Sequence, residues 1–190
     1  MPTAYRRFVR SDAEPAYAAE VARVDDLARR LVEHLDHSSA AVDRAHQYRT
    51  QSSVIQRLVS ALLKDVLGFG EEVVIEPSSG LVTRARPDFY FALATGRGVL
   101  AEVERGGTTT NNHDLKDMWK AHISPNAQHL FLVVPNANWN EARQAREHPF
   151  NRVVHRMGSF FGDPRREVDV LTAHVFGYGA TDVPWTEEPA

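Results

Sequence analysis

The sequence predicts an α/β fold in which a mixed β-sheet is flanked by helices. Three observations indicate this class. Short apolar runs with strand character alternate with longer segments whose apolar residues recur every three or four positions. The turn-forming residues TGRG at 95–98 separate two of the runs, which predicts an antiparallel hairpin. A helical segment then leads to a further apolar run, which predicts a crossover between parallel strands.

Two helices are expected before the sheet. Valines and leucines at spacings of three and four predict an amphipathic helix over 13–36, within an N-terminal helical extension that covers residues 1–45. A second helix is predicted over 52–68, where Ser53 and Gln56 have the spacing of a capping box.

The expected strands are separated by turns rich in Pro, Ser and Gly. They lie at 72–76, 88–94, 98–104 and 129–135, with a last one within 168–178. Residues 111–123 are predicted to form the crossover helix, whose apolar face carries Leu115, Met118, Trp119 and Ile123. Residues 139–161 are helical in pattern, with an interruption at Pro149.

Composition excludes several classes of protein. A chain of 190 residues suits one domain, and a hydrophobic fraction of 43% favours a folded chain over a disordered one. The absence of cysteine excludes disulfides, thiolate zinc sites and cysteine nucleophiles. A net charge of −3 argues against a protein that coats nucleic acid through bulk charge, although Lys and Arg outnumber Asp and Glu between residues 81 and 166.

Targeting signals and common catalytic motifs are also missing. No apolar run approaches the ~18 residues of a membrane span, and the segment MPTAYRRFVRSDAEP lacks the apolar core of a signal peptide. We therefore expect a cytoplasmic protein without a membrane partner. The histidines show no short zinc-binding spacing, and the chain has neither a Walker loop nor a nucleophile elbow.

Three acids interrupt the apolar runs of the expected hairpin. Glu102 and Glu104 share one face of their strand, and Asp88 begins the neighbouring strand, about 5 Å away in a paired hairpin. Two carboxylates about 4 Å apart repel by roughly 4 kcal/mol at an effective dielectric constant near 20. A divalent cation relieves this repulsion, and oxygen ligands suit Mg²⁺, Mn²⁺ and Ca²⁺. The alternative is a solvated sheet face whose acids pair with nearby arginines.

The spacing of these acids is similar to a known nuclease signature. Pro87-Asp88, thirteen intervening residues and the triplet Glu102-Val103-Glu104 resemble the signature of the PD-(D/E)xK nuclease superfamily. The order of helix, strand, hairpin, crossover helix and strand over roughly residues 50–135 resembles that superfamily as well.

The resemblance implies a restriction-endonuclease-like fold, a mixed β-sheet flanked by helices. The nuclease-like domain would span residues 46–180, followed by an acidic tail at 181–190. The implied activity is hydrolysis of DNA phosphodiester bonds with Mg²⁺, or Mn²⁺ as its substitute. The implied ligands are Asp88, Glu102 and the Val103 carbonyl.

One position departs from the superfamily. Glu104 stands where the usual lysine is found, as it does in some type II restriction enzymes, and would bind a second ion or orient the attacking water. Lys116 and Lys120 lie one turn apart on the next predicted helix, and either could supply the missing positive charge. The superfamily often adds an acid or amide from the helix before the strands, which makes Gln51 and Gln56 candidates.

Small hydrogen-bonding residues follow the acids and suit contacts with phosphate. Asn111 or Asn112 is also expected to cap the crossover helix. The residues expected to contact nucleic acid are Arg105, Gly106, Gly107, Thr108, Thr109, Thr110, Asn111, Asn112, His113, Lys116 and Lys120. A capped surface helix with solvated lysines is the alternative.

Two further readings stay open. A catalytically degenerate module on the same fold would bind nucleic acid or a protein partner, and the glutamate at position 104 favours it. Restriction-like enzymes often act as dimers because a duplex has two strands, so we expect a homodimer, with a separate partner subunit as the alternative.

Overall fold

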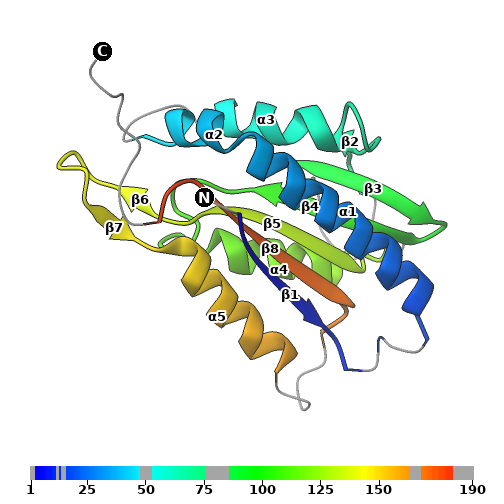
Figure 1. Cartoon of the computed structure of the whole chain (residues 1–190). Helices are drawn as coiled ribbons and strands as arrows, with labels where there is room; N and C mark the ends of the chain where they lie inside the picture. Colours follow the sequence, from blue (N-terminus) through cyan, green and yellow to red (C-terminus); the bar gives the residue numbers. More distant parts are fainter. Residues whose placement is uncertain are drawn as a thin grey trace.

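A computed structural model describes residues 3–11, 13, 16–47, 53–75, 86–162 and 168–181. It contains a mixed six-stranded sheet between two layers of helices (Figure 1). The strands are ordered β1-β8-β5-β4-β3-β2 across the sheet. Helices α1, α2 and α3 cover one face, and α4 and α5 cover the other. The predicted α/β class with a mixed, helix-flanked sheet is therefore confirmed.

The elements have the following bounds. The sheet contains β1 (Ala4–Val9), β2 (Gly70–Glu71), β3 (Phe89–Ala94), β4 (Arg97–Val103), β5 (His129–Pro135) and β8 (Thr172–Tyr178). The helices are α1 (Ala18–His37), α2 (Ser39–Ala45), α3 (Ser53–Leu63), α4 (His113–Ile123) and α5 (Pro149–Phe161). A separate hairpin is formed by β6 (Asn138–Trp139) and β7 (Ala145–Glu147).

The predicted hairpin and crossover are both present. Strands β3 and β4 are antiparallel, with Phe89 opposite Ala101, and the chain then passes through α4 into β5, which is parallel to β4. β8 extends the parallel part of the sheet beyond β5. β5 and β8 are buried along their whole length. Residues 130–134 of β5 are all apolar, as expected where helices cover both faces of a parallel sheet.

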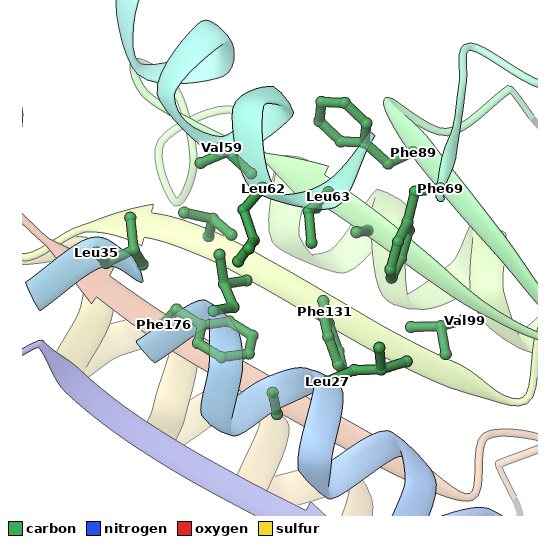
Figure 2. Close-up of a cluster of buried hydrophobic side chains, with 14 of the residues drawn as sticks. Leu27, Leu35, Val59, Leu62, Leu63, Phe69, Phe89, Val99, Phe131 and Phe176 are labelled. Atoms are coloured by element: carbon green, nitrogen blue, oxygen red, sulfur yellow. The ribbon is translucent and has the colours of Figure 1, made fainter. Parts of the chain in front are cut away.

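The alternation along β4 decides which helices its side chains meet. Val99 and Ala101 belong to the core beneath α1, α2 and α3, part of which is drawn in Figure 2, together with Phe131 and Phe176. Leu100 belongs to the opposite core, beneath α4 and α5. Glu102 is two residues after Leu100, so its side chain faces α4.

The N-terminal segment differs from the prediction. Residues 4–9 form the edge strand β1, which pairs antiparallel with β8, and are not part of a helical extension. Helix α1, predicted over 13–36, packs its Val24, Leu31 and Leu35 into the same core as the sheet. Apart from residue 181, the predicted acidic tail lies outside the described residues.

Three other local predictions are wrong. The expected strand at 72–76 is represented by the two residues of β2 and a single bridge at Ile75. The expected helix at 139–161 begins only at Pro149, because the residues before it form the β6–β7 hairpin. Trp119, predicted on the apolar face of its helix, is 61% exposed. In the described ranges, no helix has the length and apolar character needed to cross a bilayer.

Candidate active site

A pocket of about 670 Å³ lies at the end of β4, where the parallel strand leads into α4. The carboxyl ends of parallel strands are the common position for ligand sites in open α/β sheets. Here the antiparallel β3 begins at the same edge, so the pocket collects residues from several elements. It is lined by Ile55, Gln56, Asp88, Glu102, Val103, Glu104, Arg105, Gly106, His113, Asp117, Lys120 and Tyr178.

Asp88 and Glu102 are held side by side by backbone hydrogen bonds. The amide of Asp88 donates to Glu102 Oε2 at 3.3 Å, and the amide of Val103 donates to Asp88 Oδ2 at 2.9 Å. The hairpin register causes this approach, because Asp88 precedes Phe89, which is opposite Ala101. The predicted approach of Asp88 to Glu102 is therefore confirmed.

Lys120 enters this cluster from α4. Its ammonium donates to Glu102 Oε1 and lies 3.2 Å from Asp117 Oδ1. Lys116 is one turn earlier on the same helix, but it is exposed and does not line the pocket. Of the two candidate lysines, Lys120 is the one that the fold brings to the acids.

Asp117 is the acid that the sequence prediction missed. It is 4% exposed, and its Oδ2 finds no hydrogen-bond partner in the part of the chain that the structure describes. Its position three residues before Lys120 places both on one side of the helix, which is the signal that could have identified it. A buried carboxylate oxygen without a partner is the kind of group that a proton or a cation satisfies.

The cluster carries more negative charge than its surroundings favour. Burial raises the pKa of Glu102 to about 7; Lys120 opposes this rise and Asp88 adds to it. Burial raises the pKa of Asp117 to about 8, with a further contribution from Glu102. Burial also raises the pKa of Asp88. For Lys120, burial alone would lower the pKa, but the Glu102 and Asp117 carboxylates outweigh it and raise the value.

Glu104 is fixed at the pocket rim. Its amide donates to the Val133 carbonyl at 2.8 Å, and its own carbonyl accepts a hydrogen bond from the Tyr178 hydroxyl at 2.9 Å. Its carboxylate lies 2.8 Å from Nδ1 of His113, the first residue of α4. Glu104 and Glu102 thus line one pocket, but each already has its own cationic or hydrogen-bonding partner.

The donor set suits a magnesium ion bound in part by water. Asp88 and Glu102 supply hard oxygen ligands, and Val103 lines the same pocket. Within the described ranges, no group of three His, Asp or Glu side chains is arranged to hold a metal by itself. Mg²⁺ is usually bound through one or two carboxylates, waters and substrate phosphate, so a two-carboxylate site fits its chemistry.

The loop after β4 has a structural role at several predicted contact positions. Thr108 and Thr109 are buried; Thr108 donates to the Arg105 carbonyl at 3.1 Å, and Thr109 donates to Glu147 at 3.2 Å. Thr110 donates to the same carboxylate at 3.0 Å. The buried Thr108 and Thr109 hydroxyls therefore hold the loop together, and their expected contact with phosphate stays a prediction.

The remaining candidates divide between the pocket and the surface. Arg105, Gly106 and His113 line the pocket. Asn112 occupies the N-cap position in a left-handed conformation, with φ of 55°, and makes no side-chain capping bond, so the expected cap is absent there. The position of Gln51 lies outside the described residues, whereas Gln56 lines the pocket from α3.

Comparisons with known proteins do not assign the chain to a family. Neither a search against protein-family models nor a search of curated proteins finds a match. The chemistry of the pocket is thus the basis for a functional proposal.

Proposed function

We propose that the protein is a Mg²⁺-dependent nuclease that hydrolyses phosphodiester bonds in DNA. The observation that carries this proposal is the convergence of Asp88, Glu102 and Lys120 in one open pocket. Two carboxylates and one ammonium are the groups that a restriction-endonuclease-like site uses, and here the ammonium comes from α4, not from the strand. The glutamate at position 104, where the superfamily usually has a lysine, is therefore compatible with activity.

The cation would be held by Asp88, Glu102 and the Val103 carbonyl. When bound, it lowers the pKa of a coordinated water and neutralises charge on the phosphate. The pKa values of Glu102 and Asp117, which are raised mainly by burial, support this assignment, because a cation bound among buried carboxylates would stabilise their ionised forms.

The other pocket residues have separable roles. Lys120 would stabilise negative charge that develops on the phosphate, since its ammonium pairs with Glu102, one of the carboxylates that would hold the cation. Glu104 would orient the attacking water through its carboxylate, whose own direction is fixed by His113. Gln56 faces the same space from α3 and can donate to a phosphate oxygen.

The direct test is cleavage of plasmid and linear duplex DNA by purified protein in Mg²⁺, Mn²⁺ or EDTA. Cleavage should require the cation, and Asp88→Asn should lower the rate by at least about 100-fold. Glu141→Gln removes an exposed acid outside the pocket and should leave the rate unchanged. If Asp88→Asn cleaved DNA as fast as the wild type, the nuclease assignment would be wrong.

The alternative module without catalysis gives a different result. Such a protein would bind DNA or a protein partner, show no cleavage and show no cation binding that depends on Asp88. A homodimer with one site for each strand of the duplex stays a prediction, which sedimentation of the protein with and without duplex DNA would test.

A further inference from the structure

We propose that a second pocket, beside the acidic one, binds the phosphate backbone of the DNA strand next to the scissile bond. This inference rests on the proposed nuclease function and extends it to how the strand is held. The second pocket, here called the arginine pocket, has a volume of about 280 Å³. The lining residues that matter here are His46, Arg105, Asn111, Asn138, Arg146 and Glu147.

The two pockets are neighbours, because Arg105 and Gly106 line both of them. A strand whose phosphate lies in the acidic pocket therefore has the arginine pocket beside it. Gly107, with φ of 80°, also lines the arginine pocket and lets the backbone turn there. A polymer with repeating phosphates fits two adjacent pockets better than a small single ligand does.

The two pockets have opposite charge. The acidic pocket is lined by four carboxylates, of Asp88, Glu102, Glu104 and Asp117, against the cations Arg105 and Lys120. The arginine pocket is lined by Arg105 and Arg146 against the single carboxylate of Glu147. A cation and the scissile phosphate suit the first, and a neighbouring phosphate without a cation suits the second.

Glu147 is occupied within the protein. Thr109 and Thr110 donate to its Oε2, and Asn138 donates to its Oε1 at 2.7 Å. These bonds tie the β6–β7 hairpin to the loop after β4, which gives the arginine pocket fixed walls. The Glu147 carboxylate is therefore a structural link between the two segments, and Arg146 is the side chain that β7 presents to a ligand.

His46 marks a position in the arginine pocket where a bound water is expected. The side chain is 4% exposed, and its Nε2 lies 2.6 Å from the Ala137 carbonyl, so Nε2 donates and Nδ1 is an acceptor. Nδ1 has no hydrogen-bond partner among the described residues. An acceptor left unpaired in a buried site is a group that a water completes, and such a water can donate its second hydrogen to a phosphate oxygen.

The hairpin that carries Arg146 extends beyond the main sheet, as Figure 1 shows for β6 and β7. Arg146 is exposed on β7. Arg143 is also exposed, at the turn of the same hairpin, but it does not line the arginine pocket. These two arginines are a matched pair, because removal of either lowers the charge of the same hairpin by one.

The experiment compares Arg146→Gln with Arg143→Gln by fluorescence anisotropy of a labelled 20-base-pair duplex, in EDTA so that no cleavage occurs. We expect Arg146→Gln to weaken binding about tenfold and to reduce the salt slope by about 0.9, as the loss of one phosphate contact requires. Arg143→Gln should change affinity less than twofold. Equal effects of both variants, no effect of either, or a wild type that does not bind the duplex would overturn the inference.

Calorimetry with Mn²⁺ separates this inference from the nuclease proposal. Arg146→Gln should bind Mn²⁺ like the wild type, because it does not line the acidic pocket. If Mn²⁺ binding is absent while Arg146→Gln alone weakens duplex binding, the arginine pocket stands and the nuclease proposal fails. If Mn²⁺ binding depends on Asp88 and Arg146→Gln has no effect on duplex affinity, the arginine pocket fails and the nuclease proposal stands.

Discussion

Lys120 and Glu102 form an ion pair that joins helix α4 to the end of strand β4, eighteen residues apart in the chain. The Glu102 side chain is 5% exposed, and the Lys120 side chain is 26% exposed. An unpaired carboxylate at such a depth costs several kcal/mol, so the ammonium makes the acid tolerable in the folded state. Under the proposed function, the same ammonium would contact the substrate phosphate.

Replacement of Lys120 by methionine should destabilise the protein, because it leaves Glu102 and Asp117 buried without a cation. We expect a loss of roughly 3 kcal/mol in the free energy of unfolding at pH 8, measured by urea denaturation. Saturating Mg²⁺ should recover part of the loss. Lys116→Met on the exposed side of the same helix is the control, and an equal loss in that variant would contradict the prediction.

Cation binding should release protons. The pKa of Glu102 is raised to about 7 by burial, so at pH 6.5 the carboxyl is mostly protonated and must lose its proton to bind a metal ion. For each proton that the metal ion displaces, the affinity for Mn²⁺ should fall by up to about tenfold with each pH unit below 7. Titration calorimetry in two buffers with different ionisation enthalpies measures the proton release directly, and identical heats in both would refute it.

The stability of the metal-free protein should fall as pH rises through the range of Asp117. Burial raises the pKa of this carboxyl to about 8, above its ordinary value near 3.8. The protonated carboxyl therefore contributes fully to stability below its pKa in the unfolded chain. This contribution is lost as pH rises through its pKa in the folded protein. Asp117→Asn removes the titrating carboxyl, so between pH 6 and pH 9 this variant should lose about 2 kcal/mol less of its free energy of unfolding than the wild type does.

Thermal or urea unfolding at several pH values tests the Asp117 prediction. Glu141→Gln, at an exposed position on the β6–β7 turn, should follow the wild-type curve. Parallel curves for Asp117→Asn and the wild type would show that the aspartate is fully ionised throughout.

A chain of buried hydrogen bonds crosses the far end of the sheet. His129 lies 2.7 Å from Glu20 and 2.8 Å from Thr172, and His174 lies 3.0 Å from Thr172 and 2.7 Å from the Tyr5 hydroxyl. Burial lowers the pKa of both histidines, so both rings are neutral. Because the Glu20 carboxylate accepts, the hydroxyl of Thr172 must donate to His129 and accept from His174.

Thr172→Val should break this chain at its centre. It removes one hydroxyl and leaves a ring nitrogen of His129 and one of His174 without partners in a buried site. We expect a loss of about 2 kcal/mol in the free energy of unfolding at pH 7.5, measured by urea denaturation. Ser159→Ala removes an exposed hydroxyl of α5 and should lose less than about 0.5 kcal/mol. If Thr172→Val also lost less than about 0.5 kcal/mol, these hydrogen bonds would contribute little to stability.

The parts of the fold that were predictable depend on local pattern. The hairpin follows from two apolar runs around a Gly-containing turn at 95–98, and its register brings Asp88 to Glu102. The crossover follows from a helix of adequate length between two apolar strands. These signals act over a few residues, so they remain visible in a single sequence.

The parts that were missed depend on distant partners. β1 exposes three consecutive residues, Tyr5, Arg6 and Arg7, and pairs with β8 at the other end of the chain. Its sequence therefore lacks the alternation of apolar and polar residues that predicts a strand. A helical projection placed Trp119 inward, yet α4 turns Asp114 and Asp117 toward the core, where Arg156 and Lys120 neutralise them. The pair of Asp114 with Arg156 of α5, and the pairs that Lys120 makes with Asp117 and with Glu102 of β4, thus reverse the face that hydrophobicity predicts.

The central claim is that Asp88 and Glu102 share a divalent cation, and anomalous diffraction from a crystal soaked in Mn²⁺ tests it most directly. We predict one strong anomalous peak about 2.1 Å from a carboxylate oxygen of each residue. The peak should be lost in Asp88→Asn. A pocket without anomalous density at saturating Mn²⁺, with Lys120 still paired to Glu102, would contradict the claim.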